Sequence, residues 1–210
     1  LLLASVILPA SSSIPTPLSL QTTKKLHHND LILKCKVHHL NKCLNKCHVC
    51  ESELLNVTSE DTKMIEVTGF SVRNVAFNIN AVRLSINNQI CQYVPIDTDK
   101  FFPNLETLRI WSSGLKRLKG SDLKGFRELR ELLVPLNEIE SLDSDLFLHN
   151  KKIARIDFSR NKLKNVGLAF FTSLKGLTYA NFINNDCIDE NFKGDKASFI
   201  NNIREKCLPT

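Results

Sequence analysis

The sequence predicts an α/β solenoid whose strands form one parallel sheet, and three observations carry this prediction. Apolar segments that begin at Leu105, Leu129, Ile153 and Leu177 follow one another at a fixed interval of 24 residues. The apolar residues inside these segments keep the same internal spacing. Cysteines stand before and after the repeated region, where the open ends of a stack need covers. A short fixed period indicates one supersecondary unit stacked on its own copies.

Apolar residues occupy positions 1, 4, 6, 11 and 14 of each repeat, counted from its first residue. Positions 4 and 6 are one strand period apart, so they point inward while positions 3, 5 and 7 point outward. Position 9 holds Asn137, Asn161 and Asn185, whose amides can satisfy backbone groups at a sharp turn. This is the leucine-rich-repeat pattern, L-x-x-L-x-L-x-x-N-x-L, and it does not follow helical periodicity.

The register of this pattern sets the expected division of the chain. It extends back to Ala81 and forward to about Phe192, which gives about five repeats with irregular or short helical return segments. Short strands are expected before the repeats, at residues 64–69 and 75–77. We therefore expect four parts: a leader at residues 1–34, an N-terminal cysteine-bearing cap at 35–80, leucine-rich repeats at 81–192 and a C-terminal cap helix at 193–210.

The first residues read as a targeting segment. Residues 1–8 are apolar, the run stops at Pro9, and small residues follow it, which is typical of the remainder of a signal peptide. A merely disordered N-terminus is the alternative. Residues 11–25 are polar and contain proline, so we expect disorder there. No stretch approaches the 18 or more apolar residues of a membrane span.

Cysteines near the C-terminal end of the repeats predict a cap that is held by a disulfide. Residues 195–206 carry Phe199, Ile200 and Ile203 at helical spacing, and Cys207 continues the stripe. A helix on that stripe would cover the open end of the repeats. A disulfide between Cys187 and Cys207 would close a loop of about 20 residues, which is worth roughly 3 kcal/mol in the chain-entropy model.

The N-terminal cysteines leave more than one pairing open. Cys91 lies in the first repeat, within reach of the cap, and we expect a disulfide with Cys47, with Cys50 as the second choice. The connectivity of Cys35, Cys43 and the remaining cysteine does not follow from the sequence. Asn56-Val-Thr58 is the one N-x-S/T sequon, so Asn56 is the predicted glycosylation site. Caps, sequon and leader together favour the secretory route.

Several motifs resemble those of extracellular leucine-rich-repeat proteins, especially the small secreted members of insects. In the cap these motifs are Cys47-His-Val49, Leu55-Asn-Val-Thr-Ser59 and Glu66-Val-Thr-Gly69. The first repeat adds Cys91-Gln-Tyr93-Val-Pro95 and Phe101-Phe-Pro-Asn-Leu105, and the end adds Asn184-Asn-Asp-Cys187-Ile188, Phe192 and Cys207. The resemblance covers about residues 47–208. It implies a secreted or surface-exposed binding module with no catalytic residues to carry over.

Other functional classes find little support in the sequence. The chain lacks G-x-S-x-G, H-E-x-x-H and phosphate-binding glycine motifs, so we expect neither an enzyme nor a cofactor. One Trp and two Tyr provide few stacking aromatics for nucleic-acid binding. A metal- or polyanion-binding accessory protein is the alternative. It would use the Cys/His cluster of residues 35–50, or the basic surface implied by a net charge of +6 and a pI near 9.0.

The outward strand positions predict where a protein ligand binds. We expect an exposed apolar patch on the concave face around Trp111, with Leu133, Pro135 and Leu136 on the neighbouring strand. The alternative is that Trp111 folds over its own sheet. The expected binding residues are Arg109, Trp111, Glu131, Leu133, Pro135, Leu136, Arg155, Asp157, Arg160 and Tyr179. An apolar centre surrounded by arginines is typical of protein interfaces, so the predicted function is extracellular protein recognition. The sequence does not indicate the ligand or an oligomeric state.

Overall fold

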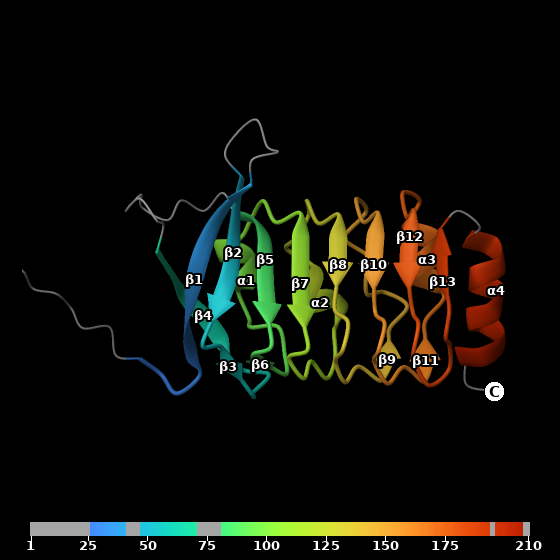
Figure 1. The fold of residues 1–210 in the computed structure, drawn as a ribbon, viewed down its shortest axis with the longest axis horizontal. Coiled ribbons are helices and arrows are strands. Elements are labelled where there is room, and N and C mark those ends of the chain that lie inside the picture. The colour runs from blue at the N-terminus through green and yellow to red at the C-terminus, as the bar shows by residue number, and fades with distance from the viewer. Residues whose placement is uncertain (1–25, 41–46, 71–80, 194–195, 208–210) are drawn as a thin grey trace, which may run out of the picture.

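The computed structural model describes residues 26–40, 47–70, 81–193 and 196–207, and one mixed sheet runs along their length (Figure 1). Its nine strands have the order β13-β12-β10-β8-β7-β5-β2-β1-β4. They are β1 (Asp30–Leu40), β2 (Cys47–Glu53), β4 (Lys63–Phe70), β5 (Ala81–Asn87), β7 (Thr107–Trp111), β8 (Glu131–Leu133), β10 (Arg155–Asp157), β12 (Tyr179–Asn181) and β13 (Asn191–Lys193). Three short helices lie behind the sheet in Figure 1: α1 (Thr98–Phe101), α2 (Gly120–Leu123) and α3 (Ala169–Ser173).

Five neighbouring strands, β5, β7, β8, β10 and β12, are parallel and follow one another in chain order. Each residue pairs with the residue 24 positions further along, as in Arg83↔Thr107 and Arg155↔Tyr179. The period of the sequence is therefore the length of chain between one strand and the next. This α/β architecture is compatible with a leucine-rich-repeat fold.

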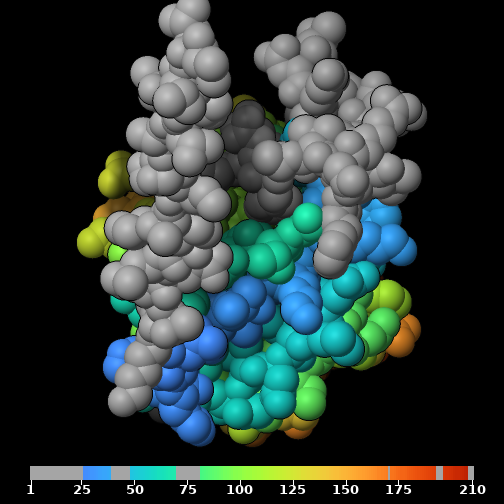
Figure 2. Space-filling model, turned by 90° about the vertical axis from the view of Figure 1, so that its left-hand side faces the viewer, coloured from blue at the N-terminus to red at the C-terminus, as the bar shows by residue number. Residues whose placement is uncertain are grey.

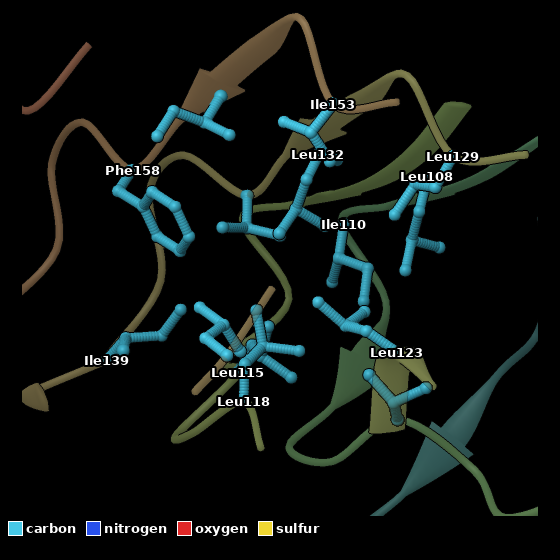
Figure 3. Close-up of a cluster of buried hydrophobic side chains, with 14 of the residues drawn as sticks. Leu108, Ile110, Leu115, Leu118, Leu123, Leu129, Leu132, Ile139, Ile153 and Phe158 are labelled. Atoms are coloured by element: carbon cyan, nitrogen blue, oxygen red, sulfur yellow. The ribbon is translucent and has the colours of Figure 1, made fainter. Parts of the chain in front are cut away.

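The repeated apolar positions form the core. Positions 1, 4, 6, 11 and 14 are buried in each of the four repeats that begin at Ala81, Leu105, Leu129 and Ile153. In Figure 3, side chains from the strands, such as Ile110, lie close to Leu115 and Leu118 of the return segments. Burying each such side chain contributes roughly 1.5–3 kcal/mol. The core is thus shared between repeats, and no repeat buries its apolar face alone.

Position 9 links each repeat to the preceding one through hydrogen bonds. Asn137 Oδ1 accepts from the backbone N–H groups of Ser113 and Leu115 at 3.1 and 3.0 Å. Its Nδ2 donates to the carbonyl of Ile110 at 2.8 Å. Equivalent bonds are made by Asn161 and Asn185. The amides therefore satisfy backbone groups that the end of each strand would otherwise leave unpaired, as the sequence predicts.

Two small parallel ladders lie on the far side of the turns. β3 (Asn56–Val57) pairs with β6 (Ile90–Cys91), and β9 (Ser141–Leu142) pairs with β11 (Asn165–Val166). A buried asparagine on the return side, Asn150, was not predicted. Its Nδ2 donates to the carbonyls of Leu123 and Phe126 at 2.9 Å, so it joins two repeats where other repeats carry an apolar side chain.

The N-terminal cap is part of the main sheet. β1 is antiparallel to β2 and parallel to β4, and β2 is parallel to β5. Figure 2 views the molecule from this end, with the blue to teal residues of the cap in front of the repeats. β1 begins at Asp30, before the cap boundary expected after residue 34, and Leu33 is already buried. The predicted signal remnant, the segment 11–25 and the strand at 75–77 lie outside the described residues.

The disulfide pattern of the cap differs from the prediction. Cys35 and Cys50 form a disulfide, with their Cα atoms 5.0 Å apart. The expected bond from Cys91 to Cys47, and the second choice of Cys50, were both wrong, because Cys91 is a free thiol. Cys91 lies on β6, which pairs with β3, whereas Cys47 begins β2 in register with Leu40. Burial raises the pKa of the Cys91 thiol to about 12.

The C-terminal cap contains the predicted helix and disulfide. Helix α4 (Lys196–Cys207) buries Phe199, Ile203 and Cys207, and Cys207 is bonded to Cys187. The Lys196 ammonium donates to the carbonyls of Phe171 and Leu174 at 2.6 and 2.7 Å, which ties the helix to the chain around α3. The antiparallel strand β13 was not predicted. It pairs with β12 and adds an edge strand to the sheet.

Ion pairs on the surface connect successive repeats. Each joins a glutamate to a basic residue 24 positions later, with N–O distances up to 3.9 Å. The five pairs are Glu106–Arg130, Glu128–Lys152, Glu131–Arg155, Glu138–Lys162 and Glu140–Lys164. The basic residues of the turns, which the sequence presents as a free cationic surface, are therefore partly neutralised.

Candidate ligand-binding face

The candidate site is the face of the sheet that Figure 1 turns toward the viewer, opposite the short helices. We call it the exposed sheet face and define it by repeat positions 3, 5, 7 and 8 of the strands from β5 to β12. Positions 4 and 6 of the same strands are buried, so alternation along the strands directs the other side chains outward. Parallel pairing in register then aligns equivalent positions of neighbouring repeats in rows.

The row at position 3 forms a chain of polar contacts across four strands. Thr107 Oγ1 donates to Glu131 Oε2 at 3.3 Å, and the other oxygen of Glu131 lies 3.6 Å from Arg155 Nε. The Arg155 guanidinium lies over the Tyr179 ring, 5.0 Å from its centroid. The structure thus joins Glu131, Arg155 and Tyr179, which are among the expected binding residues, to Thr107 in one row. Such mutual contacts order long side chains before any ligand arrives.

The predicted apolar group is present but less exposed than expected. Trp111, Leu133 and Pro135 are half-buried, and Leu136 is 37% exposed. Trp111 is partly covered because the Arg109 guanidinium lies 5.1 Å from the centroid of its ring. Pro135 removes no strand hydrogen bond, since β8 ends at Leu133. The apolar surface is therefore a small patch next to an arginine.

Leu136 has an unusual backbone conformation. Its φ is 58°, in the left-handed region, which a leucine adopts at a cost of roughly 1–2 kcal/mol. The equivalent position 8 has positive φ in all the repeats from β5 onward, and asparagine occupies it at Asn88 and Asn184. Asparagine tolerates this conformation better. Ser112 and Arg160 share this conformation, so it belongs to the repeat backbone, and at Leu136 it is combined with an exposed apolar side chain.

The carboxylates of the face have hydrogen-bond or ion-pair partners, but not all of its arginines do. Asp157 Oδ1 accepts hydrogen bonds from the backbone N–H and the hydroxyl of Ser159 at 2.9 and 2.7 Å. Glu131 is engaged by Thr107 and Arg155. Arg160, predicted to border the apolar patch, is exposed at position 8 of its repeat and forms no ion pair within the described residues. The carboxylates therefore have partners, whereas some arginines do not.

Comparisons with known proteins found matches among solved structures alone. No protein-family model matches the sequence, and no curated protein matches it. Among solved structures, 89 chains match. One belongs to the Toll–Spätzle complex of Drosophila, described as a molecular hub in development and innate immunity. It shares 21% sequence identity and a TM-score of 0.46 with this chain. The match covers 60% of this chain and 20% of the other, so it carries no argument about function.

The N-terminal cap extends the candidate face, which the sequence did not indicate. Glu51 of β2 lies in register with Ser85 of β5, and its carboxylate contacts Asn87 Nδ2 at 3.3 Å and His38 Nε2 at 3.2 Å. The alternation of Leu33, Cys35 and Val37 along β1 is the signal that could have revealed this strand.

The metal-binding alternative loses part of its ligand set. Cys35 and Cys50 are joined in a disulfide, so neither offers a thiolate. Within the described part of the chain, no group of three or more His, Cys, Asp or Glu side chains is arranged to hold a metal ion. Cys43 and the side chain of Cys47 lie outside that part. The basic-surface alternative is weakened by the ion pairs between repeats.

Asn56, the predicted glycosylation site, lies on β3 with an exposed side chain. Leu55 and Val57 on either side of it are buried, as the alternation in the sequence predicts. The two disulfides in the described residues are typical of proteins that fold in oxidising compartments. Across those same residues, none of the helices combines the length and apolar character needed to cross a membrane.

Proposed function

We propose that this chain is a right-handed leucine-rich-repeat solenoid that acts outside the cell as a non-enzymatic protein-recognition module. The ligand binds to the exposed sheet face, which is the concave face of the solenoid. The observation that carries this proposal is the arrangement on that face. A small apolar patch at Trp111 and Leu136 lies beside a row of mutually ordered polar side chains. Aromatic and arginine side chains with few alternative conformations are typical of interface hot spots.

Secretion and glycosylation belong to the same proposal. The capping disulfides support an oxidising compartment, and the exposed Asn56 supports a glycan in the cap. The chemistry of the face supports a binding role. Its carboxylates Glu131 and Asp157 are engaged by Thr107, Arg155 and Ser159 of the protein itself.

The test is a binding screen with matched variants. Tagged, full-length protein is screened against a library of secreted and cell-surface ectodomains, and each captured ectodomain is measured again with Trp111→Ala. The control is Lys124→Ala, which removes an exposed side chain next to α2 on the opposite side of the sheet. We expect Trp111→Ala to weaken binding about tenfold or more, which is at least 1.4 kcal/mol.

Thermal unfolding of both variants separates loss of binding from loss of folding. Equal binding by the two variants, with equal thermal stability, would place the ligand elsewhere on the molecule. Loss of binding by both would indicate a site on the helical side.

A further inference from the structure

The exposed sheet face carries an excess of positive charge close to its apolar patch. Four arginines lie on it at outward positions: Arg83, Arg109, Arg155 and Arg160. Two carboxylates, Glu131 and Asp157, lie on the same face, and the adjoining strand β2 adds a third, Glu51, in register with Ser85. All three carboxylates are already occupied by groups of the protein itself: Glu131 by Thr107 and Arg155, Asp157 by Ser159, and Glu51 by Asn87 and His38. Only one of the four arginines is therefore neutralised within the face.

The other three arginines lack a carboxylate partner among the described residues. Arg83 has a buried Nε for which no hydrogen-bond acceptor is present in that part of the chain. Arg109 lies over the Trp111 ring, a contact that uses the plane of the guanidinium and leaves its N–H groups available. Arg160 is exposed beyond the end of β10.

The positions of Arg83 and Arg109 suit one ligand. They lie on the adjacent strands β5 and β7, where Arg83 is in register with Thr107 and Arg109 with Ser85. They are thus diagonal neighbours on one face, which in a sheet are about 7–8 Å apart, within joint reach of one acidic segment. Trp111 is two residues further along β7, so the same ligand would also meet the apolar patch.

We infer that the exposed sheet face recognises an acidic protein segment in which Asp or Glu residues flank an apolar side chain. The carboxylates pair with Arg83 and Arg109, and the apolar side chain packs against Trp111 and Leu136. Guanidinium groups favour carboxylates because two parallel N–H···O bonds form at once. The inference rests on the proposed function and adds the chemical class of the partner.

A sulfated glycan would also bring negative charge, but it belongs to another class of macromolecule. It offers no apolar side chain to the patch at Trp111, so the observations favour a protein segment. Glycan binding is therefore an outcome that the experiment must be able to detect.

The experiment selects peptides on the whole protein. Random displayed peptides are selected on the immobilised full chain and depleted on Trp111→Ala, and the enriched peptides are synthesised. We expect Asp and Glu to be enriched next to aliphatic or aromatic residues. Binding should weaken about tenfold or more in the double variant Arg83→Gln/Arg109→Gln, and it should weaken as salt is raised. The matched control is Lys116→Gln/Lys124→Gln, which removes the same charge from exposed lysines outside the face.

The outcomes distinguish the inference from the proposed function. Peptides that require Trp111 but carry no acidic residues, or that bind the double arginine variant normally, overturn the inference and leave the proposed function standing. A selection that yields no peptide dependent on Trp111 overturns both. A heparin oligosaccharide that binds the wild type in an arginine-dependent way, while acidic peptides do not, overturns the inference in favour of a glycan.

Discussion

At the scale of single residues, position 9 of the repeat shows how one side chain can hold two repeats together. Asn161 Oδ1 accepts from the N–H of Ile139, and its Nδ2 donates to the carbonyls of Val134 and Phe158. Where the sequence lacks asparagine, Ser113 takes over part of this role, with its hydroxyl 3.4 Å from the carbonyl of Ile86. A buried polar residue is thus retained because backbone groups need partners.

Replacing Asn161 with alanine should therefore destabilise the protein strongly. The change leaves one buried N–H and two buried carbonyls without this partner, so the free energy of unfolding should fall by about 2–4 kcal/mol. Urea unfolding measures the effect. Lys162→Ala, at the next residue and on the surface, should change it by less than about 0.5 kcal/mol. Similar losses in the two variants would contradict the role assigned to the amide.

Replacing Leu136, unlike replacing Asn161, should not destabilise the protein. Asparagine adopts its left-handed backbone more easily, and it occupies the equivalent positions Asn88 and Asn184. Leu136→Asn should therefore leave the free energy of unfolding unchanged or raise it by up to about 1 kcal/mol, while ligand binding weakens. Denaturant unfolding and binding are measured on the same preparation. A marked loss of stability would mean that Leu136 serves packing and not recognition.

At the scale of elements, the sequence predicted the repeats and the final helix with its disulfide, but it missed β13 and the strands β1 and β2 of the N-terminal cap. The inward residues of the repeats and the stripe Phe199–Ile203–Cys207 of the final helix follow from periodicity, and the structure buries them. The strand β13 has only three residues, and its pairing with β12 depends on a chain reversal that leaves no period to detect. In the N-terminal cap, β4 (Lys63–Phe70) matches the strand expected at residues 64–69. The cysteine pairing was not predicted, because disulfide connectivity depends on which strands become neighbours, and β1 and β2 were not foreseen.

The C-terminal cap should depend on its disulfide. In Cys187→Ser/Cys207→Ser the free energy of unfolding should fall by about 3 kcal/mol, because the unfolded chain loses a constraint across 20 residues. Hydrogen exchange should show protection lost first in α4, β13 and β12, while β7 stays protected. Glu205→Ala, on the exposed side of the same helix, is the control. Uniform loss of protection along the sheet would contradict an end that frays independently.

At the scale of the whole molecule, five parallel strands present their outward side chains on one face, and the strands of the N-terminal cap continue the same sheet. The sequence predicted the members of the face because strand alternation determines which side chains point outward. It could not predict that Arg109 covers Trp111, since that contact depends on side-chain conformation. Nor could it show which charges remain unpaired, because pairing between repeats depends on their stacking.

A glycan on Asn56 would confirm passage through the secretory pathway. Protein secreted from eukaryotic cells should lose mass on treatment with an N-glycosidase, because Asn56 and Thr58 are both exposed. Asn56→Gln and Thr58→Ala should each abolish the mass shift, the second without touching the acceptor residue. A secreted wild type of unshifted mass would contradict the prediction. Ligand binding should be the same with and without the glycan.

The ion pairs between repeats also determine the order in which repeats can stack. In all five pairs the glutamate belongs to the earlier repeat and the basic residue to the later one. The repeat at residues 129–152 carries both kinds, with Arg130 and Lys152 facing backward and Glu131, Glu138 and Glu140 facing forward. If it stacked on a copy of itself, every one of these contacts would become a like-charge contact. The charges of this repeat therefore favour contact with its actual neighbours over contact with a second copy of itself. This disfavours both a slip of the fold by one repeat and growth of the array by simple copying of this unit.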